Sequence, residues 1–353
     1  MSLYNLTKPF LFLLSPEKAR SLAILALKYG FLPEGAAQNS TILSQNLWDL
    51  HFPNPVGLAA GFDKNAEVYQ AMLGQGFGFV ETGTVTPLEQ AGNEKPRIFR
   101  LTEDQAVINR LGFNNRGLDY YVEQLKKRDI LDGIVGANIG ANKLSDDPIN
   151  DYVIGLKSVL GLAGYFTVNI SSPNTPGLRA LQGREALDEL LGKLKDVREN
   201  ANLDKKPPLI LKIAPDLDQG ECEDIAEIIL KHQMDGLIVS NTTLSRDGLT
   251  SSNKNETGGL SGRPLFELST KILSKMYKLT KGQIPLIGAG GVGSGLQAYE
   301  KIRAGASLVQ LYSALVYHGP GLVRQINAEL EELLKKDGFN NVTDAIGIDH
   351  RNS

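Results

Sequence analysis

The stretch FTVNISSPNTPGLR, residues 166–179, decides the fold that we predict for this chain. Its first half alternates apolar and polar residues and is rich in β-branched and aromatic side chains, which is typical of a strand. Two prolines then end the strand and indicate a sharp turn. The turn places four polar side chains at the carboxyl end of the strand: Asn169, Ser172, Asn174 and Thr175. Taken alone, this loop fits a helix cap as well as it fits a functional site.

Apolar, β-rich segments like this one recur along the chain, and helical patterns separate most of them. Strands that alternate with helices form right-handed βαβ units with a parallel sheet, and eight such strands can close into a barrel. We therefore predict an α/β protein with a (β/α)8 TIM barrel, whose lower end is plugged by a hairpin at residues 43–52. The eight strands are predicted at residues 56–60, 77–84, 133–139, 165–171, 208–214, 236–242, 284–290 and 306–312.

The composition argues against several classes of protein. The chain has 353 residues, 42% of them apolar, and a net charge of −3, so it can bury a large core and lacks the basic balance of a nucleic-acid-binding protein. Its single cysteine, Cys222, cannot form an internal disulfide. The four histidines have no metal-ligand spacing, so we predict no metal site.

Residues 1–38 differ from the rest, and we predict that they form a helical segment in front of a barrel domain at residues 39–353. Four basic and two acidic residues give this segment a net charge of +2, and Ser15-Pro16 indicates the start of a second helix. Two interpretations stay open: a hairpin that only packs on the barrel, or an amphipathic segment in a membrane interface. The apolar run is too short to span a bilayer, and the lack of an organelle presequence favours a bacterial protein.

The predicted carboxyl ends of the strands carry amides rather than pairs of acids. Asn138, Asn169 and Asn241 lie on three of them, and amides inside a barrel mouth need partners. Such amides suit a flat ligand with alternating N–H and C=O groups. Two connections on the same face, residues 85–115 and 243–264, are unusually long, and long loops there commonly serve as lids or binding loops.

A glycine-rich loop follows the seventh strand. Its G-x-G-x-x-G pattern lacks the acidic residue about 20 positions later that a dinucleotide site needs. We therefore interpret it as the phosphate site of a barrel, where Gly290, Gly291 and the backbone of Tyr312 and Ser313 supply N–H groups. A single phosphate in a barrel indicates FMN, a sugar phosphate or pyridoxal phosphate.

Lys212 lies in the middle of the apolar strand PLILKIA, where a lysine without a function is costly. It could form a Schiff base with a carbonyl substrate, as in an aldolase. It could instead hold the negative charge that develops near N1 of a reduced flavin. Its position in the sequence does not choose between the two.

Together these motifs resemble one family, the dihydroorotate dehydrogenases, and within it the membrane-associated, quinone-reducing class 2. The similarity extends from about Leu47 to the C-terminus, and the serine at position 172 is typical of class 2, whereas class 1 members have cysteine there. The segments that carry the resemblance are NPVGLAAGFDKNAE, GFVETGTVTP, PRIFRL, INRLGFNN, VNISSPNTPGLR, LKIAPD, SNTT, GGLSGRPL, GAGGV and LVQLYSALVYHGP.

The resemblance implies an FMN site and a dihydroorotate site at the barrel mouth. The residues expected to bind FMN are Ala60, Gly61, Lys64, Thr84, Asn138, Asn169, Lys212, Ser240, Gly262, Gly290, Gly291, Tyr312 and Ser313. The residues expected to bind the substrate are Lys64, Asn109, Arg110, Leu111, Gly112, Phe113, Asn169, Asn174, Asn241 and Thr242. Ser240 departs slightly from the family pattern, in which threonine is commoner, but it keeps the hydroxyl.

The family also implies a reaction in pyrimidine biosynthesis. Ser172 is expected to take the C5 proton of (S)-dihydroorotate while a hydride leaves C6 for FMN, with Thr175 and Phe113 shaping a water relay and a quinone as the final electron acceptor. We expect a monomer held peripherally on the cytoplasmic side of a bacterial inner membrane. The alternatives are a Schiff-base lyase that uses Lys212, and a barrel without catalytic activity on a membrane.

Overall fold

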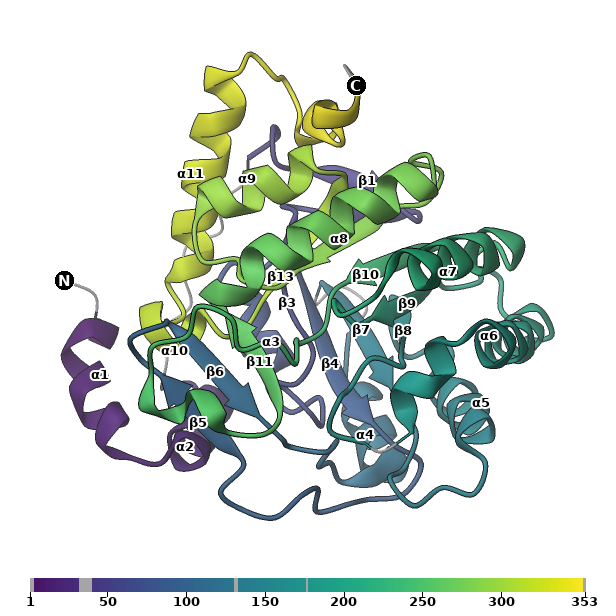
Figure 1. The fold of residues 1–353 in the computed structure, drawn as a ribbon, viewed down its shortest axis with the longest axis horizontal. Helices are drawn as coiled ribbons and strands as arrows, with labels where there is room; N and C mark the ends of the chain where they lie inside the picture. Colours follow the sequence, from purple (N-terminus) through teal and green to yellow (C-terminus); the bar gives the residue numbers. More distant parts are fainter. Residues whose placement is uncertain (1–2, 32–39, 130–132, 176, 352–353) are drawn as a thin grey trace.

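A computed structural model describes residues 3–31, 40–129, 133–175 and 177–351, and its centre is a closed barrel of eight parallel strands (Figure 1). Each predicted strand is present, and the prediction of a (β/α)8 barrel is confirmed. In order around the barrel the strands are β3 (Val56–Leu58), β4 (Phe79–Val85), β7 (Ile134–Ile139), β8 (Tyr165–Asn169), β9 (Leu209–Ile213), β10 (Gly236–Val239), β12 (Leu286–Ala289) and β13 (Ala306–Leu311).

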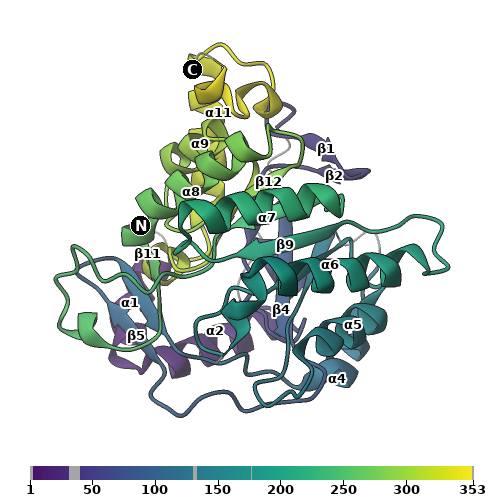
Figure 2. The same ribbon diagram turned by 45° about the vertical axis from the view of Figure 1, so that its right-hand side comes forward.

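Helices cover the outside of the barrel (Figure 2). Side-chain caps fix several of their starts: at α7, the Asp218 carboxylate accepts the Glu221 N–H at 2.9 Å, and the Glu221 carboxylate accepts the Asp218 N–H at 2.8 Å. The helices after the first strand are α3 (Tyr69–Leu73), α4 (Gly117–Leu125), α5 (Pro148–Val159), α6 (Arg184–Glu199), α7 (Gln219–Lys231), α8 (Phe266–Leu279), α9 (Gly295–Arg303), α10 (Leu315–His318) and α11 (Leu322–Lys336).

The interior of the barrel is apolar at its lower, amino end. Phe79 and Tyr165 fill it, and their ring centroids lie 6.2 Å apart. The predicted hairpin, β1 (Gln45–Leu47) and β2 (Leu50–Phe52), closes this end, and the Trp48 indole N–H donates to the carbonyl of Asp235 at 2.8 Å. Because alternate residues of a strand point inward, polar side chains occupy the next interior layer towards the carboxyl end.

The two long connections pair with each other. The connection after β4 forms β5 (Ile98–Leu101) and β6 (Ala106–Asn109), and the connection after β10 forms β11 (Gly259–Gly262). These strands make a three-stranded antiparallel sheet in the order β11-β6-β5. This sheet therefore joins the two predicted binding loops. It covers one side of the barrel mouth, and we call β5, β6 and β11 the roof.

Two helices, α1 (Leu3–Leu13) and α2 (Pro16–Lys28), precede the barrel and lie beside this small sheet (Figures 1 and 2). The break at Ser15-Pro16 is where we predicted it, although the Ser15 side chain makes no capping hydrogen bond. The Arg100 guanidinium of β5 donates to the carbonyls of Leu11 and Leu14, which lie at the end of α1. No helix in the described part of the chain combines the length and the apolar character needed to cross a membrane.

Gly57 is required by the packing of the lower barrel. A Cβ atom at this position would lie 2.2 Å from the Phe79 ring, so Gly57→Ala should shift that ring and destabilise the fold by about 1–3 kcal/mol. Gly220, near the start of α7, is a matched control because a Cβ there would meet only the Asp218 carboxylate, at 3.6 Å. Urea unfolding of both variants measures the difference. Equal stability of the two variants would contradict this packing argument.

Candidate active site

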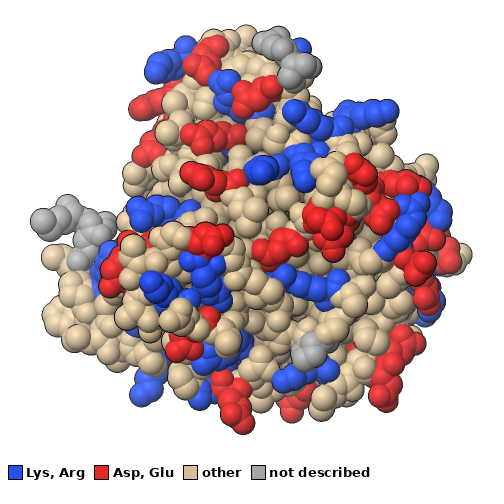
Figure 3. Space-filling view, viewed as in Figure 1, with Lys and Arg blue, Asp and Glu red and all other residues tan. Residues whose placement is uncertain are grey.

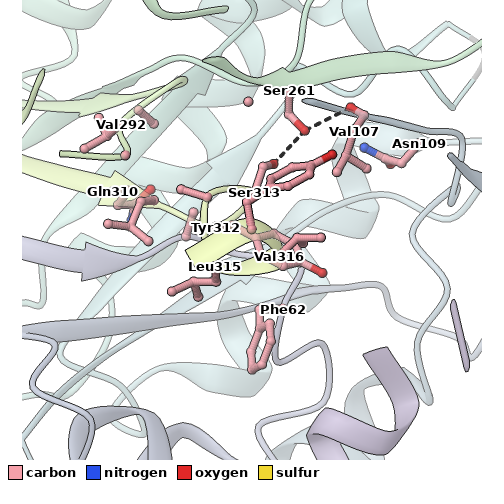
Figure 4. A pocket seen from close by; sticks show the side chains of 18 of the residues that line it. Phe62, Val107, Asn109, Ser261, Val292, Gln310, Tyr312, Ser313, Leu315 and Val316 are labelled. Carbon is pink, nitrogen blue, oxygen red and sulfur yellow. Dashed lines mark hydrogen bonds between the residues drawn. The ribbon is translucent and has the colours of Figure 1, made fainter. Parts of the chain in front are cut away.

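A cavity of about 1710 Å³ opens at the carboxyl end of the barrel and extends to α1 and α2 (Figure 4). All but two of the predicted site residues line it. They are Ala60, Gly61, Lys64, Thr84, Asn109, Leu111, Gly112, Phe113, Asn169, Ser172, Asn174, Lys212, Ser240, Asn241, Thr242, Gly262, Gly290, Gly291, Tyr312 and Ser313.

The two exceptions, Asn138 and Arg110, do not line the cavity. Asn138 lies fully buried behind its wall, where its amide oxygen accepts hydrogen bonds from Thr84 and from Asn169. Arg110 forms an ion pair with Glu256 at 2.7 Å, and its guanidinium stacks on Phe99. Asn138 therefore supports residues that line the cavity, whereas the side chain of Arg110 is committed to the loop after β10.

A buried carboxylate, Glu81 of β4, organises the polar layer below the cavity. Its side chain has no exposed surface, and one oxygen accepts the Asn138 amide N–H at 2.7 Å. The other oxygen accepts three donors, from Tyr165 at 3.1 Å, Thr167 at 3.1 Å and Gln310 at 2.8 Å. We did not predict a role for Glu81, because we examined only the carboxyl ends of the strands. The sequence did carry a signal for a role of Glu81, because it is an acid inside an otherwise uncharged barrel strand.

Lys212 of β9 is the cation of this layer. Its ammonium nitrogen lies 4.0 Å from a carboxylate oxygen of Glu81. Burial lowers the pKa of Lys212, and the charge of Glu81 opposes that effect. The geometry is compatible with both sequence-based alternatives, a Schiff-base lysine and a cation beneath a flavin.

The glycine loop after β12 is packed closely against the start of α8. Gly290 and Gly291 have φ angles of 104° and 78°, which disfavour other residues. A Cβ at Gly291 would lie 2.5 Å from Phe266, so only glycine fits between α8 and the cavity. Within the described residues the Gly291 N–H has no hydrogen-bond acceptor. These features match an anion-binding loop.

Ser172 is buried at the cavity wall, near the start of the loop that follows β8. Its hydroxyl oxygen accepts the Asn174 backbone N–H at 3.3 Å. The Thr242 hydroxyl belongs to a residue that lines the cavity, whereas Thr175 does not line it; both hydroxyls are buried, and neither has a partner among the described residues. The site thus holds hydroxyl groups whose hydrogen-bonding capacity the protein leaves unused.

The turn Gly61–Lys64 is held from outside the barrel by α2. The Arg20 guanidinium donates to the carbonyls of Gly61 and Phe62, and Glu17 pairs with Arg97 at 2.7 Å. Burial lowers the pKa of Lys64 to about 7, and the nearby charge of Arg20 adds to this effect. We did not predict these contacts of α2.

Hydrogen bonds connect the end of β13 to the roof of the cavity (Figure 4). The Ser313 hydroxyl donates to Ser261 of β11 at 2.7 Å, and Ser261 donates to the carbonyl of Val107 of β6 at 3.1 Å. On the side facing α1 and α2 the wall is apolar, and the Phe62 and Tyr312 rings meet edge to face at 5.5 Å. Polar and apolar walls therefore belong to one cavity.

A family model described as dihydroorotate dehydrogenase matches residues 42–334. The chain belongs to the dihydroorotate dehydrogenase family. The resemblance predicted from the sequence is confirmed.

Relatives match along nearly the whole chain. A dihydroorotate dehydrogenase (quinone) of Azorhizobium caulinodans is 54% identical over 99% of this chain and 100% of its own length. The mitochondrial dihydroorotate dehydrogenase (quinone) of Arabidopsis thaliana is 49% identical over 99% of this chain and 83% of its own. The ligand-free enzyme structure from Eimeria tenella is 45% identical, with a TM-score of 0.92 over 95% of this chain and 99% of that one.

The pKa of Lys64 gives a prediction for anion binding. With a pKa of about 7, Lys64 is charged below pH 7 and neutral above it. If Lys64 binds the carboxylate of orotate, as the family resemblance implies, the Kd of orotate should be nearly constant below pH 7 and rise by up to about tenfold per pH unit above it. The Lys64→Met variant should bind orotate weakly without this dependence.

The measurement is the change that orotate causes in the visible flavin spectrum, taken on both sides of pH 7. Lys95→Met serves as the control, because Lys95 is an exposed lysine that also neighbours Glu17. A wild-type orotate affinity that does not change with pH would show that Lys64 does not carry this binding.

Proposed function

We propose that this protein oxidises dihydroorotate to orotate in pyrimidine biosynthesis, with FMN in the barrel mouth and a membrane quinone as the final electron acceptor. One observation carries the proposal. A single cavity joins an amide-lined barrel mouth, at Asn169 and Asn241, to an apolar wall formed by α1 and α2. The mouth suits a polar cyclic substrate, and the apolar wall suits a lipid-soluble acceptor.

The residues of the mouth fit FMN. The Gly290–Gly291 loop can offer to a phosphate the Gly291 N–H, which has no acceptor among the described residues, and no side chain fits at Gly291. Gln310 lines the cavity and donates its amide N–H to Glu81, whereas its amide oxygen is buried without a partner among the described residues. This oxygen can accept an N–H of the ring system. When bound, FMN supplies a hydride acceptor beside the substrate and a carrier of electrons to the quinone.

The substrate is a cyclic ureide that carries a carboxylate. Lys64 holds the carboxylate, since it is a buried ammonium with no ion-pair partner among the described residues, and such a group favours a nearby anion. The Asn109 side chain lines the cavity, and the Asn174 amide donates to the Asn109 carbonyl at 3.1 Å, which fixes the two loops relative to each other. These amides pair with the N–H and C=O groups of the ring and orient it.

Ser172 removes a proton from the substrate at its hydroxyl oxygen. The Asn174 N–H donates to that oxygen and favours its negative form. The Thr175 hydroxyl lies in the same turn, has no partner among the described residues and can hold a water that takes the proton onward. Phe113, buried at the cavity wall, keeps bulk water away from the reacting carbon.

Residues 1–38 serve the membrane side, and residues 39–353 form the catalytic barrel. The described part of α1 and α2 is apolar on the cavity side and also on its outer side, and Figure 3 shows few charges over α1 at the left edge. Soluble proteins rarely expose such apolar surface, and it suits a lipid interface on the cytoplasmic side of a bacterial membrane. The exposed apolar side chains are Leu6, Phe10, Leu13, Leu22, Leu25, Tyr29 and Phe31.

Replacing Ser172 by alanine tests the chemistry. The Ser172→Ala variant should remain yellow with bound FMN, and its flavin should be reduced by dihydroorotate about 10²–10⁴ times more slowly. Stopped-flow absorbance measures the rate. Ser158→Ala, on the outer helix α5, should behave as the wild type. Normal reduction of the alanine variant would place the base elsewhere, and a folded protein that holds no flavin would refute the proposed function.

The exposed apolar face gives a test of membrane binding. The double variant Phe10→Glu/Leu13→Glu should bind phospholipid vesicles at least about tenfold more weakly, because it loses two large apolar contacts with the lipid. Reduction of its flavin by dihydroorotate should be unchanged, whereas turnover with a long-chain quinone in vesicles should fall.

The matched control is Leu144→Glu, which changes an apolar residue that is 92% exposed in the loop before α5. Vesicle sedimentation and quinone turnover of this variant should equal those of the wild type. If the double variant sediments with vesicles as well as the wild type does, α1 and α2 are only a hairpin packed on the barrel.

A further inference from the structure

Lys301 of α9 is a buried cation that the reaction described above does not use. Its side chain has no exposed surface. The ammonium group donates to the hydroxyls of Ser269 at 2.9 Å and Thr270 at 3.0 Å, both on α8. Among the described residues no carboxylate lies within ion-pair distance of it, and the Phe266 ring, 5.0 Å away, is its other favourable neighbour.

The hydrogen bonds of this cluster have a defined direction. A lysine ammonium only donates, so both hydroxyls accept from Lys301 and have one hydrogen left. Thr270 donates to the Phe266 carbonyl at 2.7 Å. Ser269 lies 3.1 Å from that same oxygen and 3.0 Å from the Gly290 carbonyl. The Phe266 oxygen is already supplied by Thr270, so the Ser269 hydrogen is available to Gly290.

The Gly290 carbonyl sets the direction of the neighbouring N–H. In a trans peptide the C=O and the N–H point to opposite sides. The carbonyl of Gly290 faces Ser269 on α8, so the N–H of Gly291 points away from α8. Both glycines line the cavity, and this N–H lies on the cavity side of the loop. The aliphatic part of Lys301 also packs against β12, the strand that leads into this loop, since a Cβ at Gly288 would meet its Cδ at 3.0 Å.

Within the described part of the chain, no counter-ion offsets the burial of the Lys301 charge. Desolvation lowers the pKa of Lys301 to about 7, and only the charge of the adjacent Glu300, on its own helix, opposes this. A buried cation next to an anion-binding loop gains from an anion in that loop. A phosphate monoester carries negative charge at neutral pH and fits this requirement.

We propose that Lys301 is a positioning residue for the phosphate group of the cofactor, acting through Ser269 on the Gly290–Gly291 peptide. This inference rests on the proposed FMN site and adds two residues, on α8 and α9, that lie outside the predicted set. The cation polarises the Ser269 hydroxyl, the hydroxyl fixes the Gly290 carbonyl, and the Gly291 N–H is held ready for a phosphate oxygen.

A competition between FMN and riboflavin tests the proposal, because riboflavin lacks the phosphate. The purified holoenzyme is equilibrated with a mixture of both flavins, and the ratio of bound FMN to bound riboflavin is measured after denaturation. Lys301→Met should lower this ratio by about tenfold or more, the scale expected for a lost charge-assisted hydrogen bond. Ser269→Ala should lower it as well, and the double variant should lower it little further.

Lys271→Met, an exposed lysine on α8, is the control and should keep the wild-type ratio. A role of Lys301 in packing alone would weaken both flavins together and leave the ratio unchanged, and that result would overturn the inference. If the wild type binds neither flavin, the proposed function itself fails. Should Lys301→Met not fold, an unchanged ratio in Ser269→Ala would still refute the mechanism.

Discussion

The buried carboxylate of Glu81 is the constraint on which the rest of the barrel mouth depends. A charge inside a barrel is tolerated only when donors surround it, and here they come from β7, β8 and β13, with the Lys212 ammonium at 4.0 Å. Because Asn138 and Gln310 each donate an amide N–H to Glu81, the orientation of both side chains is fixed. The next residues towards the mouth, among them Asn169, are oriented through Asn138. The polar layer below the cavity is therefore held together by hydrogen bonds to Glu81.

The helices α1 and α2 differ from the barrel in composition, but α2 also contacts loops of the candidate site. Arg20 holds the backbone of the Gly61–Lys64 turn, and Glu17 pairs with Arg97 in the long connection after β4. The composition changes near residue 38, but the contacts cross that boundary. The α2 helix is therefore connected through Arg20 to the turn that carries Lys64.

The barrel and most of the candidate site were predictable because both depend on local patterns. Buried parallel strands appear as β-branched runs that end in a turn, and residues at their carboxyl ends meet by topology. Glu81 was missed because its meaning depends on partners far away in sequence, such as Gln310, 229 residues on. The contacts of Arg20 and Lys301 depend on how helices dock, which no short motif encodes. The roof was unforeseen because β5, β6 and β11 are four-residue strands in loops rich in turn residues.

The roof also has a consequence for biosynthesis. Its middle strand β6 receives β11 as a neighbour only after a long stretch of chain, and Ser261 and Val107, which join the two strands, are 154 residues apart. During translation the β5–β6 hairpin therefore emerges with one edge unpaired, and the edge stays open until most of the barrel has left the ribosome. The cavity wall that these strands form is therefore completed only when segments from distant parts of the sequence have come together.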